Sequence, residues 1–365
     1  MNSLIQRIRT VPDSEVFMHI MELSAQGQAA EQPALVLIQD DDPLVRSRGF
    51  CVLENIEGAI ARNQSVLLAN LNDVEMRNCK DLAKSLIYGD VPIDAIFTRC
   101  EQLAKSPKTQ DIAASAYVAV CVGEVDSGLR DRCVPFVRNA CRHRDVFVRR
   151  HGFQALEEAL KVREKLVPEI TDGITDVDPA IRVLAANHAG QVGAKAAVPA
   201  LIEALTAEDP DLRCGAAWSL GHTGATGSRA IEPLAVALSD DDESVRINAA
   251  DSLAKFGKHS KSAMPQMLKI LSDPKLVTDL LVVAVWKIAP EKKELLTPLI
   301  ELLNHGPEDL KTLAAEHLGK LGADAAPAIP ALESAAHAST MGLDYAAKAA
   351  LRRIERALKP RPEQS

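Results

Sequence analysis

The sequence is poor in aromatic residues and lacks the long apolar runs that mark membrane proteins. Only 3% of its 365 residues are aromatic, although 47% are hydrophobic. A core with so few rings must consist of thin layers of aliphatic side chains. No apolar run is long enough to cross a membrane, and residues 1–10 are too polar for a signal peptide. We therefore expect a cytoplasmic protein with no membrane partner.

The cysteine and histidine patterns do not fit the common metal and redox sites. The seven cysteines contain no C-x-x-C pair, which is typical of scattered thiols in a reducing compartment. Cys133, Cys141 and His143 have no usual zinc spacing and lack a fourth ligand. No H-E-x-x-H, G-x-S-x-G or P-loop motif occurs. We expect no enzyme activity, catalytic residue, cofactor or metal.

What the sequence does contain is a proline period of about 33 residues. The steps range from 31 to 34 residues, and the position 13 or 14 residues after several of these prolines is arginine. The prolines are Pro135, Pro168, Pro199, Pro233, Pro265, Pro298 and Pro330, and the arginines are Arg149, Arg182, Arg213 and Arg246. A period of this size, repeated about ten times, predicts a stack of identical supersecondary units.

One unit, residues 232–257, shows what is repeated. Its first half carries apolar residues at helical spacing, and proline suits the first turn of such a helix. An acidic turn, 240–244, supplies N-cap oxygens for a second helix, whose stripe runs from Val245 through Ala249 and Leu253 to Phe256. Glycine ends this helix, as Gly193 and Gly322 end others. Each unit is thus a helix–turn–helix hairpin, and the fold class is all-α.

The run D-x-D-x-x-V-R-x-x-A-A-x-x-L-x-x-x-G recurs in whole or in part at 176–193, 209–221 and 240–257. It resembles HEAT repeats, in particular the short bacterial subtype also found in bilin-lyase-like proteins, and the pattern covers about 33–357. The resemblance implies a right-handed α-solenoid of about ten hairpins whose second helices line the concave face. It also implies a ladder of hydrogen-bonded charges between repeats, which we assign to Asp178/Arg182, Asp211/Arg213 and Asp242/Arg246.

The register of the units predicts the domain organisation. Residues 1–30 form a helical cap, with Ser14 as an N-cap, 31–358 form a single continuous HEAT-repeat solenoid, and 359–365 form a flexible tail. The long step from Gln110 to Arg149 predicts an inserted turn or a bent connection within 123–132. Repeat boundaries near 60–130 and 270–290 stay open. The ten anchor positions of the units are Arg46, Arg77, Gln110, Arg149, Arg182, Arg213, Arg246, Asp279, Lys311 and Leu343.

Helical geometry predicts which side chains of the second helices point away from the core. In the central units these are mostly polar and surround Trp218, the kind of residue that dominates protein interfaces. Trp286 falls on the core side and is expected to pack. The expected protein-binding residues, called the polar strip below, are Arg150, Gln154, Glu158, Asn187, Gln191, Trp218, His222, Asp251 and Lys255.

These features favour a non-enzymatic scaffold or adaptor that grips another protein, of unknown identity, on the concave face of the central repeats. An inhibitor or an assembly factor would be a special case. One alternative is a bilin-lyase-type enzyme or chromophore-binding protein. Another is nucleic-acid or phosphate binding through Arg130–Lys165, where Lys and Arg outnumber Asp and Glu. The net charge of −8 disfavours a nucleic-acid partner.

Overall fold

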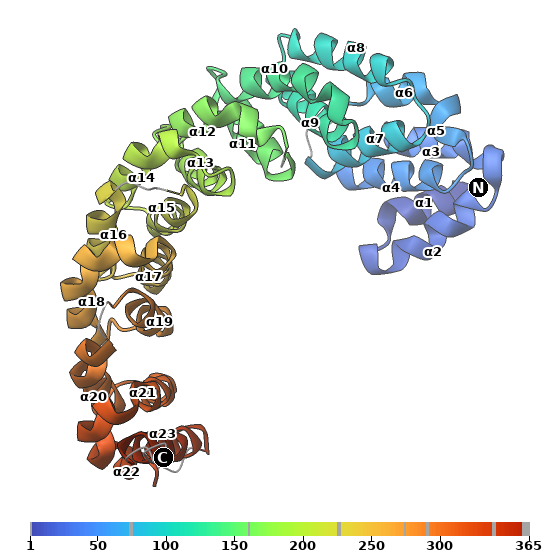
Figure 1. The fold of residues 1–365 in the computed structure, drawn as a ribbon. Helices are drawn as coiled ribbons and strands as arrows, with labels where there is room; N and C mark the ends of the chain where they lie inside the picture. The colour runs from blue at the N-terminus through green and yellow to red at the C-terminus, as the bar shows by residue number, and fades with distance from the viewer. Residues whose placement is uncertain are drawn as a thin grey trace, which may run out of the picture. The chain divides into compact units, whose positions relative to one another are not determined.

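The computed structural model consists of helices that follow one another in antiparallel pairs (Figure 1). In the part of the chain that it describes, no residue lies in a β-strand. The all-α solenoid predicted from the repeats is therefore confirmed. The structure describes residues 2–72, 76–159, 161–224, 228–273, 275–289, 292–337 and 341–359.

The chain divides into two units, Met1–Leu184 and Ala185–Ser365. The single domain expected over 31–358, the cap over 1–30 and the handedness of the solenoid stay predictions. The expected tail lies outside the described residues except for Lys359.

In the unit 1–184, first and second helices alternate along the chain. The first helices are α1 (Asn2–Thr10), α3 (Glu31–Ile38), the broken pair α5 (Ala59–Arg62) and α6 (Gln64–Ala69), α8 (Ile93–Ala104), α10 (Arg130–Cys141) and α12 (Val167–Gly173). The second helices are α2 (Asp13–Ser24), α4 (Pro43–Glu54), α7 (Met76–Tyr88), α9 (Thr109–Val125) and α11 (Val146–Glu158). Helix α13 (Pro179–Gln191) contains the boundary between the units.

The unit 185–365 continues the same alternation. Its first helices are α14 (Val198–Ala204), α16 (Ile231–Ala237), α18 (Met264–Leu271), α20 (Leu296–His305) and α22 (Ile329–Ala335). Its second helices, after the end of α13, are α15 (Pro210–His222), α17 (Glu243–Phe256), α19 (Asp279–Ile288), α21 (Glu308–Leu321) and α23 (Met341–Leu358).

The predicted register is confirmed, because all ten anchor positions fall within second helices. The acidic turns supply N-caps as expected: Asp42 accepts from the N–H of Leu44 at 2.9 Å, and Asp242 accepts from that of Ser244 at 2.8 Å. Gly193, Gly257 and Gly322 have φ values of +60°, +56° and +61°, a conformation that favours glycine at a helix end.

Two local predictions are wrong. Helix α2 begins at Asp13 after Pro12, so Ser14 lies inside the helix and is not its N-cap. The turn expected within 123–132 is present at Ser127–Leu129, between α9, which is 17 residues long and includes Gly123, and α10, which begins at Arg130. The second wrong prediction concerns Pro135, which lies inside α10 rather than in its first turn.

The core consists of thin aliphatic layers between helix pairs, as the low aromatic content predicts. Leu201 of α14, Leu220 of α15 and Leu253 of α17 have no exposed surface. Burying each such side chain contributes about 2 kcal/mol relative to leaving it exposed. Alanines such as Ala216 and Ala249 are also fully buried and let neighbouring helices approach closely.

His317 of α21 is a buried exception to this aliphatic core and predicts a pH dependence. It is 4% exposed, its ring centroid lies 4.8 Å from that of Trp286, and its Nδ1 lies 2.9 Å from the Leu313 carbonyl oxygen. Trp286 is only partly buried, and it packs against His317. Burial lowers the pKa of His317, and the nearby Lys320 acts in the same direction.

We expect the free energy of unfolding to fall as the pH drops below about 6.5, the unfolded pKa of histidine. The unfolded chain takes up the proton first, and the loss ends once the pH passes the lower folded pKa. His317→Gln should flatten this slope in urea titrations between pH 7 and pH 5. His259→Gln, at an exposed position, is the control. Equal slopes in wild type and His317→Gln would contradict the expectation.

Candidate protein-binding surface

The repeated arginine closes the turn of its own repeat. Its Nη1 donates to the carbonyl oxygens five and six positions earlier in the chain. In Arg213 these acceptors are Ala207 and Glu208, at 2.9 and 3.0 Å. The same pair of hydrogen bonds is made by Arg46, Arg149, Arg182 and Arg246. This recurrent geometry explains why the pattern keeps arginine at this place.

In two repeats the other edge of the guanidinium binds the aspartate of the following turn. Arg149 holds Asp176 through two hydrogen bonds of 2.7 and 2.9 Å, and Arg213 holds Asp240 at 2.8 and 2.9 Å. Burial alone would raise the pKa of Asp240, but the hydrogen bonds from Arg213 outweigh it and hold that pKa below its usual value. A ladder between repeats therefore exists, with planar two-point contacts.

The ladder uses other aspartates than those we assigned from the resemblance. Arg213 binds Asp240 and not Asp211, and Asp242 caps its own helix α17. Asp178 also caps its own helix and forms an ion pair with Arg150. Arg182 and Arg246 donate to backbone carbonyls, with Leu276 as a further acceptor for Arg246. The first aspartate of a turn, Asp176 or Asp240, thus binds the repeated arginine of the preceding repeat, whereas the third caps its own helix.

In the unit 185–365, the structure brings four residues of the polar strip together at the surface of α15 and α17. Trp218 is partly buried, and its ring centroid lies 4.1 Å from that of His222 with the planes tilted by 36°. Its indole also lies over the backbone of Gly190, where a Cβ would come within 2.5 Å of Cζ3. Within the described residues, no acceptor binds the indole N–H. Trp218 is thus supported from two sides and stays partly exposed.

His222 links this tryptophan to a charged pair. Its Nδ1 lies 2.8 Å from the carbonyl oxygen of Trp218, and its Nε2 lies 2.9 Å from Lys255 Nζ. A lysine ammonium can only donate, so Nε2 accepts and the proton of the neutral ring is on Nδ1. Lys255 also forms an ion pair of 2.7 Å with Asp251. The result is a preorganised surface with one aromatic and three polar groups, called the Trp218 cluster below.

The remaining members of the polar strip in this unit lie on α13. Asn187 is partly buried, and its Oδ1 would lie 2.8 Å from a Cβ at Gly215. Gln191 is exposed, and its Oε1 lies 3.2 Å from His188 Nδ1. Both therefore belong to the same row of second helices, and their contacts are with residues outside the Trp218 cluster.

In the unit 1–184, the strip residues on α11 have different neighbours. Arg150 forms its ion pair with Asp178. The Tyr117 hydroxyl lies 3.4 Å from Gln154 Oε1 and 3.2 Å from His151 Nδ1. Burial lowers the pKa of His151 and raises that of Tyr117. The side chain of Glu158 lies outside the described residues. Tyr117 was missed by the sequence analysis, because α9 belongs to a degenerate repeat, and the place of His151 beside it on α11 depends on that contact.

The basic segment Arg130–Lys165 is largely occupied by internal contacts. Arg138 and Arg142 both bind the buried Glu169, at 2.8 and 2.9 Å. Other partners in the segment are Asp94 for Arg132, Asp131 for Lys165, and the Leu156 carbonyl oxygen for Arg163. These contacts give the arginines a structural role, so no specific observation favours phosphate or nucleic-acid binding there.

The described residues offer neither a metal site nor a membrane span. No group of three or more His, Cys, Asp or Glu side chains there could hold a metal ion. Burial raises the pKa of the Cys133 thiol to about 12 and also raises that of Cys141. None of the described helices has the length and apolar character required to span a membrane.

Comparisons with known proteins agree with this architecture. Residues 167–235 match the family model of HEAT repeats. The sequence matches no curated protein.

Three solved structures illustrate the similarity in fold. Importin beta has a TM-score of 0.62 at 16% identity, and the match covers 99% of this chain and 56% of importin beta. Kap95p, solved with RanGDP, has a TM-score of 0.68 at 12% identity, and the match covers 98% and 55% of the two chains. YibA of E. coli has a TM-score of 0.50 at 16% identity, with 84% and 98% covered. The chain thus spans little more than half of the first two proteins.

Proposed function

Because the chain is a HEAT-repeat protein, we propose that it is a non-enzymatic scaffold or adaptor that binds a protein partner through the second helices of its central repeats. Solenoids of this fold are typically protein-binding scaffolds and are generally not enzymes. Kap95p, which has a similar fold, binds RanGDP. In this chain the binding residues are those of the polar strip, with Trp218 at their centre.

The observation that carries the proposal is the supported, partly exposed tryptophan. Trp218 is supported by the Gly190 backbone on one side and by His222 on another. Little side-chain entropy is therefore lost when a partner covers it. Its indole N–H is available for a partner carbonyl, and the exposed part of its ring for an apolar side chain. The ion pair of Lys255 with Asp251 supplies a polar rim.

The test is an affinity capture from native cell extract with wild type beside Trp218→Ala. We expect a stoichiometric protein that is captured by the wild type and lost in the variant. With the purified partner, the dissociation constant should rise about 30-fold, because truncating a covered tryptophan typically costs about 2 kcal/mol.

Val236→Ala is the matched control, because Val236 is an exposed apolar residue on the first helix α16. It should leave the dissociation constant unchanged, and thermal unfolding should show that both variants are folded. A partner list unaffected by Trp218→Ala would overturn the proposed site. Capture of a coloured ligand or nucleic acid alone would overturn the scaffold function.

A further inference from the structure

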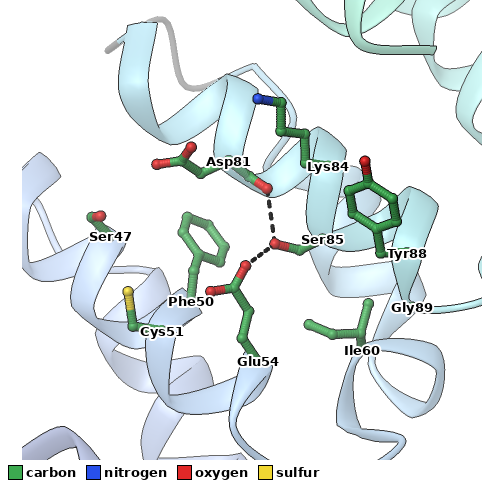
Figure 2. A pocket seen from close by; sticks show the side chains of 10 residues that line it. All are labelled: Ser47, Phe50, Cys51, Glu54, Ile60, Asp81, Lys84, Ser85, Tyr88 and Gly89. Atoms are coloured by element: carbon green, nitrogen blue, oxygen red, sulfur yellow. Dashed lines mark hydrogen bonds between the residues drawn. The ribbon is translucent and has the colours of Figure 1, made fainter. Parts of the chain in front are cut away.

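The unit 1–184 contains a pocket of about 440 Å³ between the second helices α4 and α7 (Figure 2). Pockets of this size can hold a small ligand or a single side chain. Phe50 of α4 lies buried in its wall, whereas Tyr88 of α7 is 72% exposed. The residues that line it are Ser47, Phe50, Cys51, Glu54, Ile60, Asp81, Lys84, Ser85, Tyr88 and Gly89.

The pocket lies where this repeat departs from three others. Glu54 stands eight positions after Arg46, the place held by glycine in Gly190, Gly221 and Gly319. Each of these glycines touches the next second helix so closely that a Cβ would come within 3.0 Å of it. Glu54 has a long side chain at this place, and it contacts Ser85 of α7.

The pocket is acidic, and its carboxylates are not neutralised from within. The single Ser85 hydroxyl proton is shared between one oxygen of Glu54 and the Asp81 carbonyl oxygen. Among the described residues, neither Glu54 nor Asp81 has a cation within ion-pair distance. Lys84 is the one cation in the lining, which leaves a net charge of −1. Figure 2 shows the Glu54 side chain pointing from α4 toward α7, with Asp81 and Tyr88 on the α7 side.

We propose that this pocket binds a cationic side chain of a protein partner, with arginine preferred over lysine. A planar guanidinium can donate to carboxylates on two helices at once and stack on an exposed tyrosine, which a lysine ammonium does less well. The net charge of −8 for the whole chain also favours basic partners. The inference rests on the proposed function only in taking the partner to be a protein.

The test uses the full ¹⁵N-labelled chain and three capped tripeptides, Ac-Gly-Arg-Gly-NH₂, Ac-Gly-Lys-Gly-NH₂ and Ac-Gly-Gln-Gly-NH₂. We expect the arginine peptide to cause saturable amide shifts at Glu54, Ser85 and Tyr88. The dissociation constant should lie in the millimolar range, which corresponds to a binding free energy on the order of −4 kcal/mol. The lysine peptide should bind more weakly, and the glutamine peptide should cause no saturable shift. Raised salt should weaken the binding.

The double variant Glu54→Gln/Asp81→Asn removes both charges and keeps the acceptor for the Ser85 hydroxyl, so the pocket should keep its shape. It should bind the arginine peptide at least ten-fold more weakly. Glu101→Gln, an exposed change on α8, should bind like the wild type. An equal response to the glutamine peptide, undiminished binding in the double variant, or no saturable shift at these amides would overturn the inference. Trp218→Ala should not affect this titration, so failure here and failure of the proposed function are separate results.

Discussion

Gly221→Ala should destabilise the unit 185–365 by about 2 kcal/mol, although alanine usually stabilises a helix interior relative to glycine by about 1 kcal/mol. Gly221 lies in α15 against α17, where a Cβ would come within 2.8 Å of Ser252 Cβ and 2.9 Å of its Cα. The obstacle is thus the backbone of the next helix, which cannot rotate away. Ser252 is also fixed by a hydrogen bond of 2.7 Å to the Ala217 carbonyl oxygen. Urea unfolding followed by circular dichroism measures the loss.

The control for this prediction is Gly342→Ala at the start of α23. The nearest atom to a Cβ there is Thr312 Oγ1, at 3.9 Å, and the residue is exposed. Its effect should be zero or a gain of a few tenths of a kcal/mol, because only helix propensity changes. Equal stability changes in the two variants would show that the close approach of α15 and α17 does not limit residue 221.

The fold could be predicted from the sequence because each hairpin repeats the same local chemistry. Proline, the capping aspartate and the terminal glycine act within a few residues of their place in the chain, so their roles do not depend on distant contacts. The prediction was least accurate where the pattern is weakest. Gly123 lies inside the helix α9, which continues to Val125 and ends at Asp126.

The ladder partners could not be predicted, because several aspartates in and beside a turn have similar sequence surroundings. Which of them reaches Arg213 depends on the offset between two successive hairpins, and this offset is a tertiary property. The outward position of Trp218 followed from helical geometry alone. The support of Trp218 by Gly190 and the pocket at Glu54 did not follow from helical geometry, because both depend on the side chains of the adjacent second helix. The sequence signal for such close approaches was that Gly190 and Gly221 hold the same place in successive repeats.

Arg213→Ala should cost the unit 185–365 about 3 kcal/mol, because it leaves a partly buried carboxylate without its partner. The side chains of Arg213 and Asp240 are 16% and 12% exposed. The substitution also removes the two hydrogen bonds that close the turn at Ala207 and Glu208. Arg213→Lys keeps the charge but not the planar fork, so it should recover less than half of the loss. Chemical unfolding of the three proteins at pH 7 measures both effects.

The electrostatic contribution of the Arg213–Asp240 ion pair to stability can be measured through its pH dependence. Because the folded pKa of Asp240 is lowered, its contribution is fully present above the unfolded value of about 4 and is lost as the pH falls through the folded pKa. Asp240→Asn keeps an acceptor oxygen for the Asp242 N–H and should remove this part of the acid sensitivity. Arg213→Ala removes the main group that lowers the pKa of Asp240, so the acid-induced loss of stability should shrink as well. If both variants kept the wild-type acid sensitivity, other carboxylates would have to carry it, and the ladder would be a contact of geometry rather than of charge.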